Sequence, residues 1–195
     1  MDRRFWPDPN QHPMGHKIQA DIKKFGWHIT SVSAPMMPPT YAYSTGLYET
    51  LGRPELVIFG LHPNQMASAI NALGDMLRSG RPSFSTGTRL ARFWEDDTLP
   101  AAFGAVQPHW QRKVLAVSQW FYRQKLVPTL QCYWPDDAGR FPWEAGFDAA
   151  LDLFQPLLSR GSAREARMQG WSEMEEWSLT PGPVGPPPFG PQGSA

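Results

Sequence analysis

Six polar side chains that could perform acid–base or nucleophilic chemistry lie in or beside three predicted strands. They are His28, Tyr43, Ser44, Thr45, Glu55 and His62. If neighbouring strands bring them together, a Ser or Thr hydroxyl beside a histidine could act as a nucleophile with its general base. We therefore take His28, Tyr43, Ser44 and His62 as candidate catalytic residues, and Thr45 and Glu55 as candidate ligand-binding residues.

A structural interpretation of the same six residues competes with the catalytic one. The segment Ser44-Thr45-Gly46 lacks the G-x-S-x-G pattern of a nucleophile elbow. Buried hydroxyl groups in a strand are usually hydrogen-bonded inside the protein, and a histidine can have the same role. The sequence favours this structural interpretation and leaves the catalytic one open.

A second polar set surrounds a predicted loop between two tryptophans. Its members are Gln131, Trp134, Asp136, Asp137, Arg140, Trp143 and Glu144. Aromatic walls with carboxylates suit a cationic or planar ligand, so Gln131, Trp134, Asp136 and Trp143 are further candidate ligand-binding residues. The alternative is that the aspartates cap a turn and the tryptophans pack on the core.

Metal and nucleotide chemistry are not predicted. His12 and His16 have the spacing of two ligands on one helical face, but Pro13 and Gly15 lie between them. The chain contains no H-E-x-x-H motif or cysteine cluster, and neither the G-x-x-x-x-G-K-[ST] nor the G-x-G-x-x-G phosphate-binding pattern. We therefore expect no metal and no cofactor.

Charge and apolar runs exclude two classes of partner. Lys and Arg number 18, as do Asp and Glu, so no net field draws the chain to nucleic acid or anionic lipid. The most apolar run, residues 56–61, is far shorter than the roughly 20 residues that span a bilayer. Cys132 is the single cysteine, and the first ten residues lack the apolar run of a signal peptide, so we expect a cytoplasmic protein.

Apolar periodicity predicts the elements that would position these residues. Helices are expected over 15–25, 64–79, 109–123 and 146–158, with Asn64 as the cap of the second. Strands are expected over 27–33, 41–47, 56–61, 89–94, 102–106 and 128–134. The run 56–61 is apolar without alternation, which predicts a central strand covered on both faces.

This order of elements contains few β-α-β crossovers, which favours an α+β fold with a mixed, mostly antiparallel sheet and three to four packing helices. We expect an N-terminal extension over 1–14, one globular domain over 15–160, and an acidic, aromatic segment with a Pro/Gly-rich tail over 161–195. In the last 15 residues, 10 are Pro or Gly, a composition that buries little surface.

Several short motifs resemble a known family. They are Phe25-Gly26-Trp27-His28-Ile29, the run Tyr41 to Leu47, Arg53-Pro54-Glu55-Leu56, and the stretch from Gln131 through Trp143-Glu144. In this order they resemble the bacterial family called domain of unknown function 4262, over about residues 15–158. The resemblance implies membership, but it implies no reaction and no catalytic residues.

The segment 170–177 has the composition of a recognition element. Trp171, Met174 and Trp177 recur every three residues among three glutamates, and on a helix they would share one side. Such a segment docks its aromatic face into a groove on a partner or on its own domain. These three residues are the candidate partner-binding residues.

The leading hypothesis is a binding or interaction protein of the immunity, adaptor or regulatory type, with a protein partner and with homo-oligomerisation open. No motif has the spacing of a known catalytic apparatus, whereas aromatic residues suited to interfaces include nine tryptophans. The rival hypothesis is a small-molecule enzyme that uses His28, Tyr43, Ser44 and His62 for metal-free general acid–base chemistry. A structural subunit of a larger assembly is a third.

Overall fold

A six-stranded sheet forms the centre of the protein. The computed structural model describes residues 6–33, 39–80, 83–94 and 98–160. The strands are β1 (His28–Val32), β2 (Tyr41–Thr45), β3 (Glu55–Phe59), β4 (Arg89–Trp94), β5 (Leu99–Ala105) and β6 (Thr129–Tyr133), in the spatial order β1-β2-β3-β6-β5-β4. Only β3 and β6 pair in parallel, and the other four pairings are antiparallel. The predicted α+β class with a mixed, mostly antiparallel sheet is confirmed.

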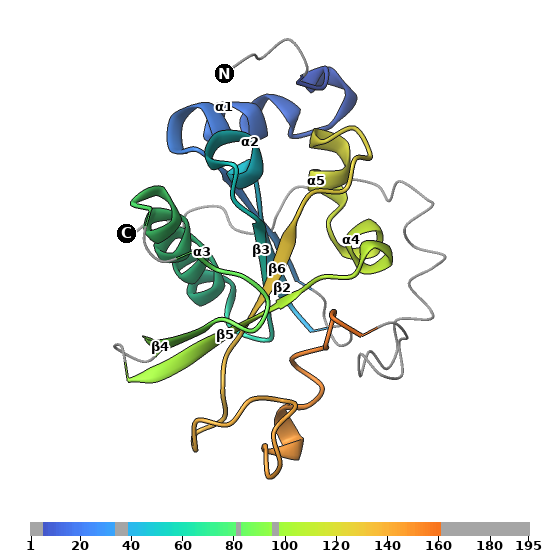
Figure 1. Ribbon diagram of the computed structural model, residues 1–195. Coiled ribbons are helices and arrows are strands. Elements are labelled where there is room, and N and C mark those ends of the chain that lie inside the picture. Colours follow the sequence, from blue (N-terminus) through green and yellow to red (C-terminus); the bar gives the residue numbers. More distant parts are fainter. Residues whose placement is uncertain (1–5, 34–38, 81–82, 95–97, 161–195) are drawn as a thin grey trace, which may run out of the picture.

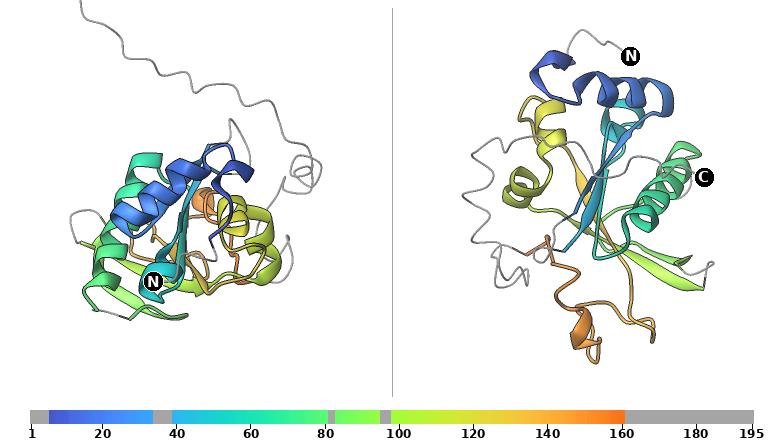
Figure 2. Two further views of the ribbon diagram at one scale, coloured as in Figure 1. Left: turned by 90° about the horizontal axis from the view of Figure 1, so that it is seen from above. Right: turned by 180° about the vertical axis from the view of Figure 1, so that it is seen from behind.

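Helices cover both faces and one end of this sheet. They are α1 (Gly15–Phe25), α2 (Leu47–Leu51), α3 (Pro63–Arg78), α4 (Pro108–Val114) and α5 (Ala116–Phe121), with 3-10 turns η2 (Pro9–Gln11) and η3 (Ala149–Leu151). Figure 1 shows α3 on one side of the sheet, α4 and α5 on the other, and α1 with α2 across the top. The view from behind in Figure 2 shows the same layers. None of the helices in the described ranges has the length and apolar character of a membrane span.

Alternation along the strands divides the core between the two faces. Ala42, Leu56 and Ile58 pack with the apolar side of α3, whereas Tyr43 and Val57 pack with α4 and α5. Every residue of β3 is buried, and β3 lies between β2 and β6. The prediction of a central, covered strand in this run is therefore confirmed, with bounds of Glu55–Phe59.

The predicted last helix over 146–158 is wrong. Within it the structure contains only the three-residue turn η3, and the buried residues are the consecutive run 155–158, which has no helical period. The Gln131 side chain binds the backbone of Pro156 and Leu158, and Gln155 binds both backbone groups of Trp134. Proline has no N–H for a helix, and these side-chain amides hold the segment against the sheet instead.

The predicted helix over 109–123 is interrupted at Leu115, between α4 and α5. Two tyrosines of β2 bind the backbone at the interruption, because the Tyr41 hydroxyl donates to the Val114 carbonyl and Val117 N–H donates to the Tyr43 hydroxyl. The short helix α2 was not predicted. His62, rather than Asn64, caps α3, and its Nδ1 accepts the Asn64 N–H.

We predict that Gly74→Ala destabilises the protein, although alanine normally stabilises a helix interior by up to about 1 kcal/mol relative to glycine. A Cβ atom at Gly74 would lie 2.6 Å from the Trp27 indole, whose Nε1 is anchored on Asn71. Relieving this overlap should cost about 1–3 kcal/mol in the free energy of unfolding, measured with urea. Ser68→Ala, at an exposed position of α3, is the matched control and should change stability by less than about 0.5 kcal/mol. A Gly74→Ala variant as stable as the parent would contradict the close packing of α3 on Trp27.

Candidate functional site

Glu55, at the start of β3, is the centre of a buried polar network. Its Oε1 accepts the N–H groups of Gly46 and Tyr48 at 2.8 and 3.1 Å and the hydroxyl of Tyr122. Its Oε2 accepts the hydroxyl of Ser44. Burial raises the pKa of Glu55, and these four donors offset part of that effect.

The network is suited to holding elements together. Gly46 and Tyr48 lie at the first turn of α2, where N–H groups lack helical partners, so the carboxyl of Glu55 satisfies them. Ser44 Oγ also accepts the Leu56 N–H at 2.9 Å, and Thr45 Oγ1 lies 2.7 Å from Ser118 Oγ on α5. These hydroxyls are therefore hydrogen-bonded inside the fold, as the structural interpretation of the sequence expects.

We predict that Glu55→Ala lowers the free energy of unfolding by about 3 kcal/mol or more, because several buried donors lose their acceptor at once. Tyr122→Phe removes one of these donors and should cost about 1–2 kcal/mol. Asp75→Ala is the control, since Asp75 forms an exposed ion pair with Arg78 that should contribute less than about 1 kcal/mol. Urea unfolding of the three variants gives the comparison. Equal stability of Glu55→Ala and Asp75→Ala would show that this carboxyl does not hold α2.

His28 is the candidate catalytic residue that reaches a pocket. Its Nδ1 donates to Asp21 Oδ2 of α1 at 2.7 Å, and Lys17 Nζ binds the same oxygen at 2.7 Å. The pocket has a volume of about 600 Å³ and opens between α1, β1 and α3. Its lining residues are Lys17, Asp21, Lys24, Phe25, Trp27, His28, Ile29, Asn71, Asp75 and Arg78.

The Asp21–His28 pair is tuned toward a neutral imidazole beside an ionised carboxylate. Burial lowers the pKa of His28, and the hydrogen bond and charge of Asp21 offset part of this. Burial alone would raise the pKa of Asp21, but the hydrogen bonds from Lys17 and His28 outweigh it and the pKa is lowered. A neutral imidazole that donates from Nδ1 has a lone pair on Nε2, which can accept a hydrogen bond or a proton.

We predict that the fold loses stability between pH 7.5 and 5.5 partly through His28. The unfolded state binds a proton near pH 6.5, whereas the lowered pKa of folded His28 delays protonation, so the free energy of unfolding falls as the pH falls. His28→Gln should show a smaller fall, by at most about 1.4 kcal/mol. Urea unfolding at the two pH values measures this. The lowered pKa of Asp21 acts below about pH 4, outside this range. The same pH dependence in both proteins would contradict the assignment.

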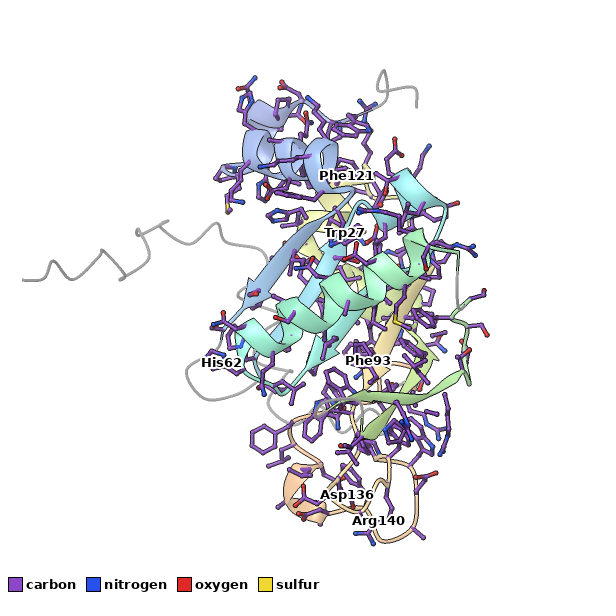
Figure 3. The ribbon with its side chains drawn as sticks, turned by 90° about the vertical axis from the view of Figure 1, so that its left-hand side faces the viewer. Trp27, His62, Phe93, Phe121, Asp136 and Arg140 are labelled. Carbon is purple, nitrogen blue, oxygen red and sulfur yellow. The ribbon has the colours of Figure 1, made fainter. Side chains whose placement is uncertain are left out.

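The four candidate catalytic residues do not meet at one place. His28 and Thr45 are paired across β1 and β2, and Ser44 contacts Glu55. His62 follows the other end of β3 from Glu55, where it is exposed and caps α3. Figure 3 shows His62 at the start of α3, well apart from Trp27, the neighbour of His28. The structure therefore brings together Ser44 and Glu55, places the Thr45 hydroxyl against Ser118 of α5, and leaves His62 apart.

Asp136, in the second polar set, organises a turn. Asp136 Oδ1 accepts the N–H groups of Ala138 and Arg140 at 3.0 and 2.9 Å. Its Oδ2 accepts Arg140 Nε at 2.9 Å and the Asp148 N–H at 3.2 Å. Asp136 and Arg140 lie together on the lower loop in Figure 3. All four hydrogen bonds of this carboxylate are made to the loop itself. This agrees with the alternative interpretation from the sequence, in which the aspartates cap a turn.

The aromatic and amide members of the second set are also used in packing. Trp134 Nε1 donates to the Phe59 carbonyl at 2.8 Å, and Gln131 is fully buried with its amide bound to the segment 156–158. Trp143 stacks on Phe141 at a ring distance of 5.2 Å and remains 41% exposed. Trp143 is therefore the more exposed of the two tryptophans in this set, since Trp134 is half-buried. The described residues contain no group of three or more His, Cys, Asp and Glu side chains arranged to hold a metal ion.

Sequence reasoning missed several residues of the pocket. Lys17 and Asp21 have the i, i+4 spacing of an ion pair on α1, a signal that could have been recognised. Asp21 meets His28 only because the chain reverses at Gly26, and Asn71, Asp75 and Arg78 arrive from α3. The candidate partner-binding residues Trp171, Met174 and Trp177 lie outside the described residues.

The geometry thus defines a mixed α+β protein with a basic, partly aromatic pocket at one edge of its sheet. The family model for a domain of unknown function, DUF4262, matches residues 21–148. That match covers more than half of the 195 residues, and the chain belongs to this family. No curated protein and no solved structure gives a match.

Proposed function

We propose that this protein is a binding protein, and that an acidic segment of a partner protein binds around Phe25. The observation that carries the proposal is the Phe25 ring, which is 51% exposed at the end of α1 beside Lys23 and Lys24. Neither lysine has an ion pair among the described residues. Exposed aromatic side chains with basic neighbours are frequent anchors of protein interfaces.

Two pockets meet at this ring. The pocket beside His28 and a second pocket of about 320 Å³ share Lys24, Phe25 and Arg78 in their linings. The second pocket extends over Trp6, Gly26 and Leu51. We refer to Lys17, Lys23, Lys24, Phe25, Trp27 and Arg78 as the Phe25 surface. A segment that crosses the ring could place one side chain in each pocket.

The charge of the Phe25 surface selects an acidic partner. Four basic side chains, Lys17, Lys23, Lys24 and Arg78, lie near two acidic ones, Asp21 and Asp75. Lys24 Nζ lies 4.8 Å from the centre of the Phe25 ring, and the Arg78 guanidinium 4.5 Å from the Trp27 ring. These contacts hold the cations against aromatic faces. Arg78 also pairs with Asp75 and donates to the Phe25 carbonyl, and Lys17 pairs with Asp21. An incoming carboxylate would therefore be drawn mainly to Lys23 and Lys24. Lys23 and Lys24 also suit the C-terminus of a helix, which is their role within the fold.

Binding explains the site better than catalysis does. A nucleophilic mechanism needs a free hydroxyl beside His28, but the Ser44 hydroxyl donates to Glu55 and the Thr45 and Ser118 hydroxyls bind each other. The Tyr43 hydroxyl accepts the Val117 N–H. General acid–base chemistry by His28 with Asp21 is the alternative. A cytoplasmic location, suggested by the single cysteine, is part of the proposal.

The test uses a fluorescein-labelled peptide, Glu-Glu-Phe-Glu-Glu, and fluorescence polarisation with the full chain. We expect the peptide to bind, and the reversed-charge peptide Lys-Lys-Phe-Lys-Lys not to bind. Phe25→Ala and Lys24→Glu should each weaken binding about five- to tenfold, because one loses the aromatic anchor and the other an attractive charge. The affinity should also fall as salt rises.

Arg92→Glu is the matched control, since Arg92 is exposed on β4 at the opposite edge of the sheet. It makes the same charge reversal and should leave the affinity unchanged. Equal binding by Lys24→Glu and Arg92→Glu, or no binding of the acidic peptide at millimolar concentration, would overturn the proposal.

A further inference from the structure

A groove separate from the two pockets of the Phe25 surface lies where the described part of the chain ends. It has a volume of about 330 Å³ and contains residues of β4, β5, β6 and the segment 157–160. The residues that matter here are Arg89, Ala102, Tyr133, Trp143, Leu157 and Arg160. We propose that the segment 170–177 of the same molecule binds in this groove, with the indole of Trp171 or Trp177 inside it.

The groove has the shape and the apolar lining of a site for one aromatic side chain. Ala102, Tyr133 and Leu157 are almost fully buried and form its apolar part, and the 41%-exposed side chain of Trp143 contributes to the lining. The Trp143 ring packs edge-on against Tyr133 at 5.0 Å. The volume of the groove is at the small end of the range for ligand pockets, which suits a single indole better than an extended ligand.

The Tyr133 hydroxyl is a buried polar group of this groove. Tyr133 is 1% exposed, and its hydroxyl makes no hydrogen bond within the described ranges. Ser159 is close enough to influence its ionisation, but not at hydrogen-bonding geometry. Burial raises the pKa of Tyr133, so the hydroxyl remains a donor at neutral pH. A buried donor without an acceptor costs stability, and a carbonyl or carboxylate of an incoming segment would satisfy it.

The charges of the groove and of the segment are complementary. Arg89 and Arg160 line the groove. Arg89 binds Glu144 and lies over the Phe141 ring, and Arg160 has no ion pair among the described residues. The segment 170–177 contains Glu173, Glu175 and Glu176 and no basic residue, so its glutamates would lie near Arg160 when an indole enters the groove.

Chain connectivity favours the same molecule as the source of the segment. Arg160 itself lines the groove, and ten residues, 161–170, separate it from Trp171. Ten residues span up to about 35 Å when extended, more than a return to the groove requires. A tether this short gives a high effective concentration, so a weak contact within one molecule outcompetes the same contact between molecules.

The test places a nitroxide spin label on the full chain at Ser178→Cys, next to Trp177. Cys132 is fully buried, and burial raises the pKa of its thiol, so the label reacts with the introduced cysteine. We expect loss of the amide NMR signals of Gly87 and Gly104, which line the groove, and retention of the Gly26 signal at the Phe25 surface. Trp171→Ala with Trp177→Ala should restore the lost signals, as should Arg160→Glu.

Leu179→Ala is the control for a nearby apolar residue that is not an anchor, and it should leave the pattern unchanged. Mixing isotope-labelled protein without the nitroxide and unlabelled protein with it should give no signal loss if the contact is within one molecule. Three outcomes would each overturn the proposal. The first is loss of the Gly26 amide signal in place of the Gly87 and Gly104 signals, the second is signal loss in the mixed sample, and the third is no signal loss at any residue. None of these outcomes depends on the acidic-peptide assay of the Phe25 surface.

Discussion

The buried carboxyl group of Glu55 is the interaction on which the upper half of the molecule depends. It lies at the first residue of β3, and through its two oxygens it contacts the end of β2, the first turn of α2 and, by Tyr122, the residue that ends α5. A buried acidic group is expensive unless its oxygens are satisfied. Here the cost is offset by donors from three separate parts of the chain, which fixes how those parts meet.

Local sequence patterns were sufficient for most elements and for the class of the fold. Both α1 and β4 were predicted with their observed bounds. For α1 the reason is that apolar spacing and the glycine after the helix define where it begins and ends. The last predicted helix failed although its apolar spacing was real. The Gln131 amide binds backbone groups of Pro156 and Leu158, and the Gln155 side chain binds the backbone of Trp134, so the segment is held against the sheet in a non-helical form. The prediction of one continuous helix over 109–123 failed for a similar reason. The tyrosines that bind the backbone beside Leu115 lie more than 70 residues earlier in the sequence, so no local pattern shows the break.

The candidate site was predictable only in part. Composition identified His28, Glu55 and the hydroxyls of β2 as unusual polar residues of predicted strands, and the structure shows that most of them are hydrogen-bonded to one another or to α5. The pocket depends on Asp21 and Arg78, which reach His28 and Trp27 from helices on two sides of an edge strand. No spacing of residues along the sequence predicts these contacts, because they follow from how α1 and α3 pack on the edge strand.

The order of strands has a consequence for how the chain assembles. β1, β2 and β3 form one antiparallel unit, β4, β5 and β6 form another, and the parallel pairing of β3 with β6 is their only junction within the sheet. In that junction Glu55 lies opposite Thr129, so the paired residues are 74 positions apart (129 minus 55). Closing such a loop costs chain entropy before its contacts form, whereas the first unit needs only short closures. The entropic cost of assembling the sheet is therefore greatest at the pairing of β3 with β6, whereas the pairings of β1 with β2 and of β2 with β3 join segments that are close in sequence.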